Sequence, residues 1–146
     1  MVAAVIRDPD GRVLLARRPE GRHMAGLWEF PGGKVRDGEA PTEALARELV
    51  EELDCRTTIA EPVTFAVHEE PGLRILLLFY AAALDGCEPR PREGQEIAWV
   101  PVSELHRYPT PPADAELVAR LARQEHQVGD SRPADEGCPR PPTRTR

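Results

Sequence analysis

Runs of apolar and β-branched residues, separated by turn residues, dominate the chain up to about residue 100. This pattern predicts strands over residues 2–6, 12–18, 63–68, 73–84 and 96–100, with a further short strand at the start of residues 28–33. Asp8-Pro9-Asp10-Gly11 is a strong turn signal between the first two runs. We therefore expect the chain to open with a hairpin whose two strands both enter the core. Because Met1 lies almost inside the first strand, we also expect the native chain to begin a few residues earlier.

Two segments have helical instead of alternating periodicity. The first begins near Pro41 and ends before Asp54; one sector is acidic, and the other carries the apolar residues Leu45, Ala46, Leu49, Val50 and Leu53. The second covers residues 113–124 and repeats Leu117, Val118 and Leu121, while residues 103–106 predict a helical turn. Strands interleaved with so few helices indicate an α+β domain with mixed α/β layers, not a doubly wound fold.

Length and composition divide the chain into two parts. With 146 residues, it is long enough for one domain with a substantial core. Near residue 126 the composition becomes rich in Pro and Arg and poor in apolar residues, and such a segment cannot offset its ordering entropy by burial. We expect a folded domain over residues 1–125 and a disordered tail over residues 126–146.

Charge and cysteine content exclude several classes of function. The formal net charge of −6 argues against a general nucleic-acid or anionic-membrane surface. No apolar run has the length of a transmembrane helix, so we expect a cytoplasmic protein without membrane or nucleic-acid partners. We expect a monomer and leave a dimer open. Cys55, Cys87 and Cys138 are an odd, scattered set without CxxC spacing, which predicts reduced thiols, with no disulfide and no zinc site.

The helix that begins near Pro41 concentrates negative charge. Glu48, Glu51 and Glu52 share one sector, where like charges three or four residues apart repel by a few tenths of a kcal/mol per pair. A hard divalent cation with oxygen ligands would neutralise them. The alternative is a glutamate-rich, solvated helix face, but such a face requires no particular residues at fixed distances from it.

The spacing around these glutamates is specific. Gly33 is followed by five residues, Glu39, seven residues and then Arg47-Glu48-Leu49-Val50-Glu51-Glu52-Leu53-Asp54-Cys55. This resembles the Nudix signature GX5EX7REUXEEXGU, in which U is aliphatic, and departs from it where Asp54 replaces the last glycine. We expect Asp54 to adopt the left-handed conformation that Asn and Asp tolerate past a helix end. Residues 14–18, 23–34, 93–95 and 111–114 are also similar to the MutT-like nucleoside triphosphate pyrophosphohydrolases, so the resemblance spans residues 2 to about 124.

The resemblance implies a Nudix fold, in which a central mixed β-sheet lies between helices, and a Mg²⁺ site that Mn²⁺ could also fill. The implied metal ligands are the carbonyl of Gly32 and the carboxylates of Glu48, Glu51, Glu52 and Glu93. Glu48 is also implied as the general base. Arg47 and Glu39 are expected to support the site, with Arg47 orienting carboxylates by paired hydrogen bonds in preference to contacting phosphate. Arg18 and Lys34 are candidate phosphate-binding cations.

Asp114 and Phe30 are the candidate base-binding residues. In the MutT type that prefers 8-oxoguanine, an Asn matches Asp114. An ionised carboxylate only accepts hydrogen bonds, which suits the N–H groups of guanine or the amino group of cytosine. Asp114 is alternatively a helix N-cap before Ala115, and Phe30 either stacks on the base or fills the core.

The sequence therefore predicts a Mg²⁺-dependent hydrolase that cleaves a nucleoside triphosphate to a monophosphate and pyrophosphate. The resemblance favours 8-oxo-dGTP as the substrate and hence a role in cleaning the nucleotide pool for DNA replication and repair. A CTP or modified dCTP pyrophosphohydrolase is the alternative. A non-catalytic module that senses a nucleotide is a third hypothesis, which the presence of all three helix glutamates disfavours.

Overall fold

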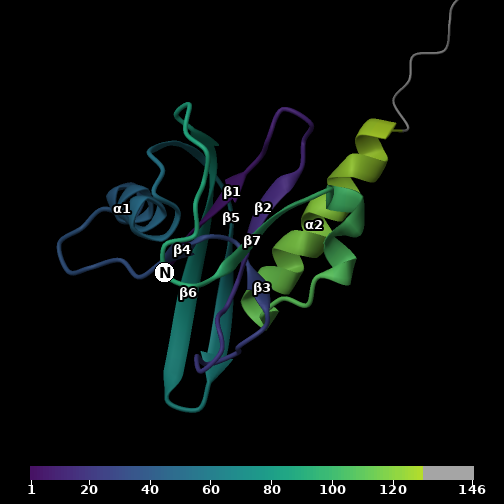
Figure 1. Cartoon of the computed structure of the whole chain (residues 1–146). Helices are drawn as coiled ribbons and strands as arrows, with labels where there is room; N and C mark the ends of the chain where they lie inside the picture. Colours follow the sequence, from purple (N-terminus) through teal and green to yellow (C-terminus); the bar gives the residue numbers. More distant parts are fainter. Residues whose placement is uncertain (130–146) are drawn as a thin grey trace, which may run out of the picture.

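The computed structural model describes residues 1–129, in which two α-helices lie on opposite sides of a pair of β-sheets (Figure 1). The elements are β1 (Val2–Ile6), β2 (Val13–Arg17), β3 (Trp28–Glu29), β4 (Gly32–Gly33), α1 (Pro41–Leu53), β5 (Thr57–Glu70), β6 (Leu73–Leu84), β7 (Glu96–Val100), the 3-10 helix η1 (Val102–Arg107) and α2 (Pro112–Gly129). One sheet has the order β4-β1-β6-β5 and the other β3-β2-β7. Since β1 runs parallel to β6 and antiparallel to β4, the larger sheet is mixed, which agrees with the predicted α+β class.

The predicted hairpin between the first two strands is wrong. β1 lies between β4 and β6, whereas β2 lies between β3 and β7 in the other sheet. Within the described residues, a single bridge from Arg7 to Val13 pairs the two runs. The turn itself is present, because the Asp8 carboxylate accepts hydrogen bonds from the N–H groups of Asp10 and Arg12. The turn signal therefore predicted the reversal of the chain correctly but not which strands pair. Each of these buried strands pairs with two other strands.

β1, β6 and β7 have the predicted bounds, but β5 begins at Thr57 instead of residue 63. The first part of this strand was not predicted because Pro62 interrupts the strand pattern. The pairing of β5 with β6 shifts register on both sides of Pro62, between Ile59 and Thr64. Since β5 is also an edge strand, a residue without an N–H is tolerated there.

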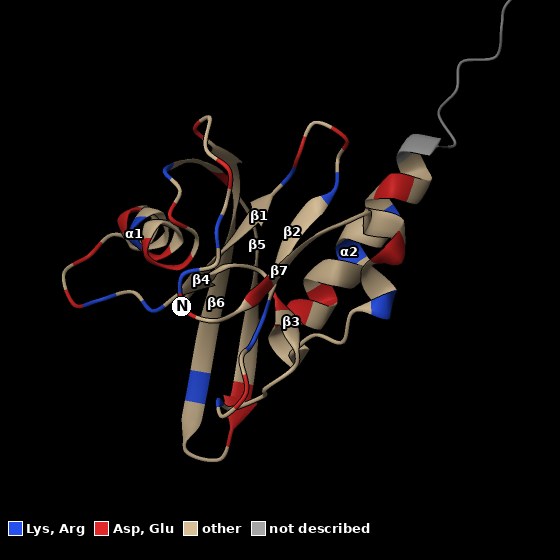
Figure 2. Ribbon diagram, viewed as in Figure 1, with Lys and Arg blue, Asp and Glu red and all other residues tan. Residues whose placement is uncertain are grey.

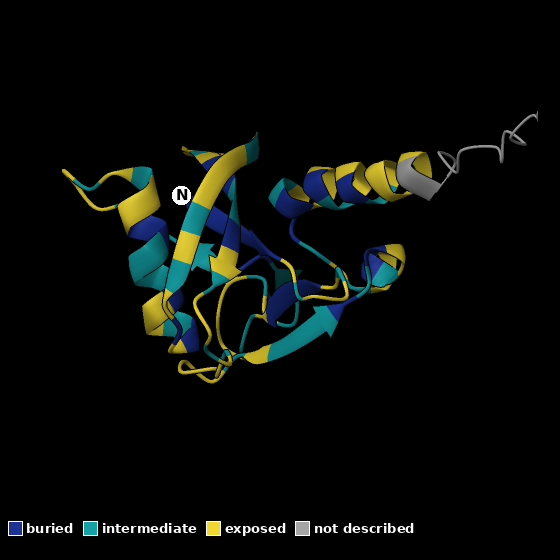
Figure 3. Ribbon diagram, turned by 90° about the horizontal axis from the view of Figure 1, so that it is seen from above, coloured by how far each residue is buried: buried dark blue, intermediate teal, exposed yellow. Residues whose placement is uncertain are grey.

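The core consists of two clusters, one on each side of the sheets (Figure 3). Along β1, alternate residues face opposite sides, as expected for a strand covered on both faces: Val2 and Ala4 join the cluster with α1, and Ala3 and Val5 join the cluster with α2. α2 contributes Leu117 and Leu121 to its cluster, as its periodicity predicted.

The apolar face of α1 is narrower than predicted. Leu45, Leu49 and Leu53 are buried as expected, but Val50 is 45% exposed and Ala46 is only half-buried. The buried stripe follows the i,i+4 series, and Val50 lies roughly 100° round the helix from Leu49. This narrow stripe leaves the remaining faces of α1 available for polar contacts.

α2 is longer than the predicted helix over residues 113–124. Its last turns, from Ala122 onward, carry mainly Arg, Gln and Glu, which favour helix without needing an apolar partner. The helix therefore continues past residue 125, where we expected the folded domain to end. Residues 130–146, which hold most of the predicted disordered tail, lie outside the described residues. Among the described residues, neither helix has the length and apolar content needed to cross a bilayer.

The cysteine prediction is also wrong. Cys55 and Cys87 form a disulfide, with their Cα atoms 5.7 Å apart. Cys55 follows Asp54, which ends α1 in the expected left-handed conformation, with φ 56° and ψ 33°. Cys87 follows β6, so the bond ties the end of α1 to the segment that leads to β7. The two residues are 32 positions apart and become neighbours only in the folded chain. Cys138 lies outside the described residues.

Candidate active site

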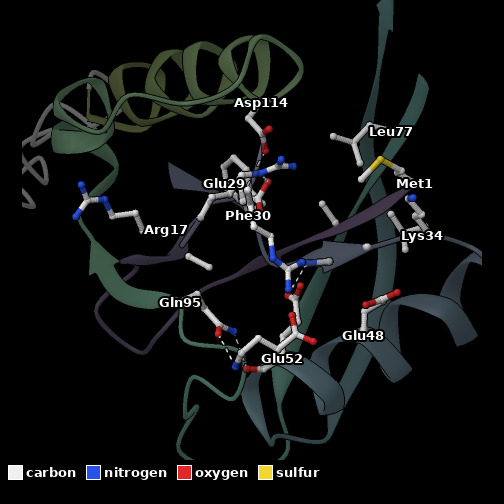
Figure 4. Close-up of a pocket in the computed structure, with 18 of the residues that line it drawn as sticks. Met1, Arg17, Glu29, Phe30, Lys34, Glu48, Glu52, Leu77, Gln95 and Asp114 are labelled. Atoms are coloured by element: carbon white, nitrogen blue, oxygen red, sulfur yellow. Dashed lines mark hydrogen bonds and ion pairs between the residues drawn. The ribbon is translucent and has the colours of Figure 1, made fainter. Parts of the chain in front are cut away.

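A cavity of about 350 Å³ lies where α1, β4, the end of β2 and the start of α2 meet (Figure 4). Asp114 lies at one end, and Glu48 and Glu52 lie at the other. The structure brings eight of the predicted site residues into its wall: Arg18, Phe30, Gly32, Lys34, Glu48, Glu52, Glu93 and Asp114. Segments from widely separated parts of the chain thus meet at one place.

The three predicted glutamates of α1 do not have the same surroundings. Glu48 and Glu52, one helical turn apart, both line the cavity. Glu51 does not line it; its side chain is 42% exposed and contacts the guanidinium groups of Arg36 and Arg47. Acidic residues are visible along α1 in Figure 2. The structure therefore separates two inward carboxylates from one at the rim.

Arg47 links several parts of the site through a forked set of hydrogen bonds. Its Nε and Nη2 donate to the two oxygens of Glu39, at 2.7 and 2.9 Å. Its Nη1 donates to Glu48 Oε1 at 2.9 Å and to Glu51 Oε2 at 3.3 Å, and its Nη2 also donates to the carbonyl of Lys34 at 2.9 Å. Neither Arg47 nor Glu39 lines the cavity. Arg47 thus holds Glu39 and Glu48 by hydrogen bonds, and its role in orienting ligands stays a prediction.

This pairing shifts the protonation equilibria of both partners. Hydrogen bonding to Arg47 is the main cause that lowers the pKa of Glu39 to about 2, and the N–H of Arg36 adds to it. The same bond to Glu39, followed by the bond to Glu48, raises the pKa of Arg47. Arg47 and Glu39 are therefore both charged at any physiological pH.

Two glycines permit the close approach of β4 to its neighbours. A Cβ atom on Gly33 would overlap the carboxylate of Glu48, and one on Gly32 would overlap the carbonyl of Val2 on the paired strand β1. The Gly32 N–H donates to Glu52 Oε2 at 3.3 Å. The glycines of the signature loop thus allow the backbone to pack directly against both inward carboxylates.

Glu52 is the most perturbed carboxylate at this end of the cavity. Burial is the largest cause that raises its pKa to about 8, and the nearby charges of Glu29, Glu93 and Glu48 raise it further, against the hydrogen bond from Gly32. Carboxylate and carbonyl oxygens are the donors that hard divalent cations prefer. Within residues 1–129, however, no three acidic, His or Cys side chains converge into a preformed metal cluster. The donor set fits a divalent ion that also keeps water ligands.

Glu29 is a site residue that the sequence reasoning missed. Its carboxylate accepts a hydrogen bond from Arg18 Nε at 2.8 Å, and burial raises its pKa while Arg18 lowers it. The signal available in the sequence was a single acidic residue between Trp28 and Phe30. Arg18, a predicted phosphate ligand, also donates from Nη1 to the carbonyl of His23 at 2.9 Å. Lys34, by contrast, makes no side-chain hydrogen bond or ion pair within the described residues.

Asp114 and Phe30 form the opposite end of the cavity. Asp114 is 4% exposed and accepts a hydrogen bond from the Phe30 N–H at 3.4 Å. Burial is the main cause that raises its pKa to about 7; the charge of Glu29 adds to the rise, and the Phe30 N–H and Arg18 oppose it. The N-cap alternative is wrong, because α2 begins at Pro112 and Asp114 lies inside its first turn.

Phe30 fills core and also reaches the cavity. It is 3% exposed, and its ring packs edge to face against Phe79 with centroids 5.8 Å apart. It also lines the cavity beside Asp114. Trp28 and Trp99 are partly buried, and each packs against one of the two core clusters.

Comparison with known proteins gives consistent matches. A family model described as the NUDIX domain matches residues 2–120. The chain is 40% identical to an 8-oxo-dGTP diphosphatase of Haemophilus influenzae over 86% of this chain and 93% of that protein. It is 37% identical to a CTP pyrophosphohydrolase of Escherichia coli over 92% and 96%. A crystal structure of a MutT protein from Methanosarcina mazei is similar with a TM-score of 0.75 at 28% identity, over 85% of this chain and 92% of that one.

Proposed function

Because the chain belongs to the Nudix family, we propose that it hydrolyses nucleoside triphosphates to monophosphates and pyrophosphate with the help of a divalent metal ion. The observation that carries the proposal is the cavity itself. It joins oxygen donors of α1, β4 and the Glu93 loop at one end to the buried Asp114 at the other. The acidic oxygens suit a metal-bound triphosphate, and Asp114 suits a base.

We propose Mg²⁺ as the ion, held by the Gly32 carbonyl and by Glu48, Glu52 and Glu93, with Glu51 at the rim. When bound, Mg²⁺ neutralises phosphate charge and acidifies a coordinated water. The all-oxygen donor set supports this choice over softer metals. Mn²⁺ has similar ligand preferences, and we expect it to substitute.

Glu48 is the proposed general base. Glu48 lines the cavity, and its Oε1 accepts a hydrogen bond from Arg47, whereas its Oε2 accepts none within the described residues. One oxygen therefore fixes the carboxylate while the other remains able to accept a proton from water. Arg47 and Glu39 take no proton in this scheme; they hold Glu48 in place.

Lys34 and Arg18 are two of the cationic residues that line the cavity. Lys34 is the proposed phosphate contact, because its ammonium is exposed and unpaired within the described residues. Arg18 is fixed by Glu29 and the His23 carbonyl, and its Nη2 has no hydrogen bond among residues 1–129, so it is available to a phosphate or sugar oxygen. Fixed and free cations together would orient the triphosphate along the cavity.

Asp114 supports two substrate classes. With a pKa of about 7, it exists in both protonation states near neutral pH. The protonated form donates to a carbonyl oxygen such as that of 8-oxoguanine, and the ionised form accepts from the amino group of cytosine. We propose 8-oxo-dGTP as the preferred substrate. The second candidate, a CTP or modified dCTP activity, is favoured by the same carboxyl group.

The test is pyrophosphate release with Mg²⁺ from 8-oxo-dGTP, dGTP, CTP, 5-methyl-dCTP and a nucleotide sugar, compared by kcat/KM. Preference for 8-oxo-dGTP supports the first candidate, and preference for the cytosine nucleotides supports the second. The matched control is Glu48→Gln, for which kcat should fall on the order of 10²-fold or more while the fold is retained. No release from any of these nucleotides would refute the enzymatic proposal and favour a nucleotide-sensing module.

A further inference from the structure

The loop that carries Glu93 is fastened to the C-terminal end of α1. The N–H of Arg90 donates to the carbonyl of Leu53 at 2.8 Å, and the N–H of Arg92 donates to the carbonyl of Glu52 at 2.9 Å. The Arg92 guanidinium also pairs with Asp54 at 3.0 Å. The last carbonyls of a helix have no partner inside the helix, so this loop supplies the partners that α1 lacks.

The side chain of Gln95 also links the loop to α1, by donating one hydrogen bond and accepting another. Its Nε2 donates to the carbonyl of Glu52 at 2.8 Å, and its Oε1 accepts from the N–H of Glu93 at 2.7 Å. One amide thus connects the backbone of Glu52 to that of Glu93, and it lies beside Glu52 in the cavity wall (Figure 4). Making both bonds requires a side chain that has a donor and an acceptor and is as long as Gln.

Glu93 has little else to hold it. It is exposed, it lies outside regular secondary structure next to Gly94, and its carboxylate has no hydrogen bond or ion pair within the described residues. It lies close enough to Glu52 for its charge to help raise the pKa of that carboxyl group. Without a link to α1, no other contact of its side chain within the described residues would keep Glu93 at the cavity.

We propose that Gln95 is a positioning residue that holds Glu93 next to Glu52 so that both carboxylates bind one metal ion. The inference rests on the proposed function, because it takes Glu93 as a ligand. Gln95 itself does not contact the ion. Its side chain fixes the position of the Glu93 backbone relative to α1. The Glu93 carboxylate can then reach the metal site through rotation of the Glu93 side chain alone.

The test measures Mn²⁺ binding by electron paramagnetic resonance in the absence of nucleotide. Gln95→Met keeps the size of the side chain and removes both hydrogen bonds, and we expect Mn²⁺ to bind roughly tenfold more weakly, as for other groups that support metal ligands. The nucleotide KM at saturating Mg²⁺ should change little. Gln124→Met, on the exposed face of α2, is the matched control and should bind Mn²⁺ like the wild type. Gln95→Asn, too short to make both bonds, should repeat the effect if Gln95→Met does not fold.

A double-mutant cycle separates positioning from helix capping. Glu93→Gln should weaken Mn²⁺ binding, and adding Gln95→Met should weaken it no further if Gln95 acts through Glu93. Further weakening in the double variant would overturn the inference, as would wild-type binding by Gln95→Met. If Glu93→Gln weakens binding and Gln95→Met does not, only the inference fails. If Glu93→Gln binds Mn²⁺ normally, the proposed metal set fails together with the inference.

Discussion

Replacing the buried Asp114 by Asn should stabilise the protein increasingly as the pH rises. In the unfolded chain the carboxyl group has its usual pKa of 3.8, and in the folded protein its pKa is about 7. Folding therefore favours the protonated form. Between these two values the unfolded state releases the proton and the folded state retains it, so stability falls as the pH rises from about 4 to about 7.

The size of the effect follows from the two pKa values. Their difference of about 3 units corresponds to about 4 kcal/mol when the pH is well above 7. At about pH 5 only about 1.6 kcal/mol of this cost is present. Asn has nearly the same shape, keeps an oxygen for the Phe30 N–H and does not titrate. The gap in unfolding free energy between Asp114→Asn and wild type should widen by about 3 kcal/mol from about pH 5 to about pH 8.

Urea unfolding of both proteins at these two pH values measures the gap. Titrating groups that do not interact with Asp114, such as Glu52, are present in both proteins and cancel in the difference. Asp37→Asn, at an exposed position without a hydrogen bond or ion pair within the described residues, is the control and should show no pH-dependent gap. A gap of the same size at both pH values for Asp114→Asn would refute the argument that burial raises the pKa of this residue.

Three further outcomes are expected. Gly33→Ala should displace the Glu48 carboxylate and lower kcat about 10²-fold with an unchanged circular dichroism spectrum; wild-type turnover would show that Glu48 can move without loss. Arg47→Lys keeps the charge but not the fork, so pyrophosphate release should slow roughly tenfold; equal rates would contradict the orienting role. Reducing the Cys55–Cys87 disulfide, which spans 32 positions, should lower the unfolding free energy by about 3–4 kcal/mol, and Cys87→Ser should match the reduced protein if the bond is responsible.

Local periodicity predicted the acidic face of α1 correctly because helix geometry alone places Glu48 and Glu52 on one side. It did not distinguish Glu51, since only the surrounding chain decides which part of an acidic face borders a cavity. The left-handed conformation of Asp54 was likewise predictable from its place after a helix. Features within one element were therefore accessible from the sequence.

Features that depend on distant contacts were not accessible. The hairpin was predicted from a turn that is present, but β1 and β2 pair with other strands and lie in different sheets. The spacing of the two cysteines does not indicate that they form a disulfide. Glu29 could be recognised as a site residue only from its contact with Arg18 in the folded chain. Each of these features depends on which distant segments become neighbours in the fold. Local patterns in a single sequence do not indicate that.

The fork of Arg47 means that α1 carries its own counter-ion. The guanidinium contacts Glu39, Glu48 and Glu51, so much of the charge repulsion along the helix is relieved within the polypeptide itself. In zinc fingers the metal supplies the folding free energy, and the apoprotein is unfolded. In this chain, Arg47 supplies part of the neutralisation of α1 through its bonds to Glu48 and Glu51. We therefore expect folding of this domain to depend much less on a metal ion than the folding of a zinc finger does.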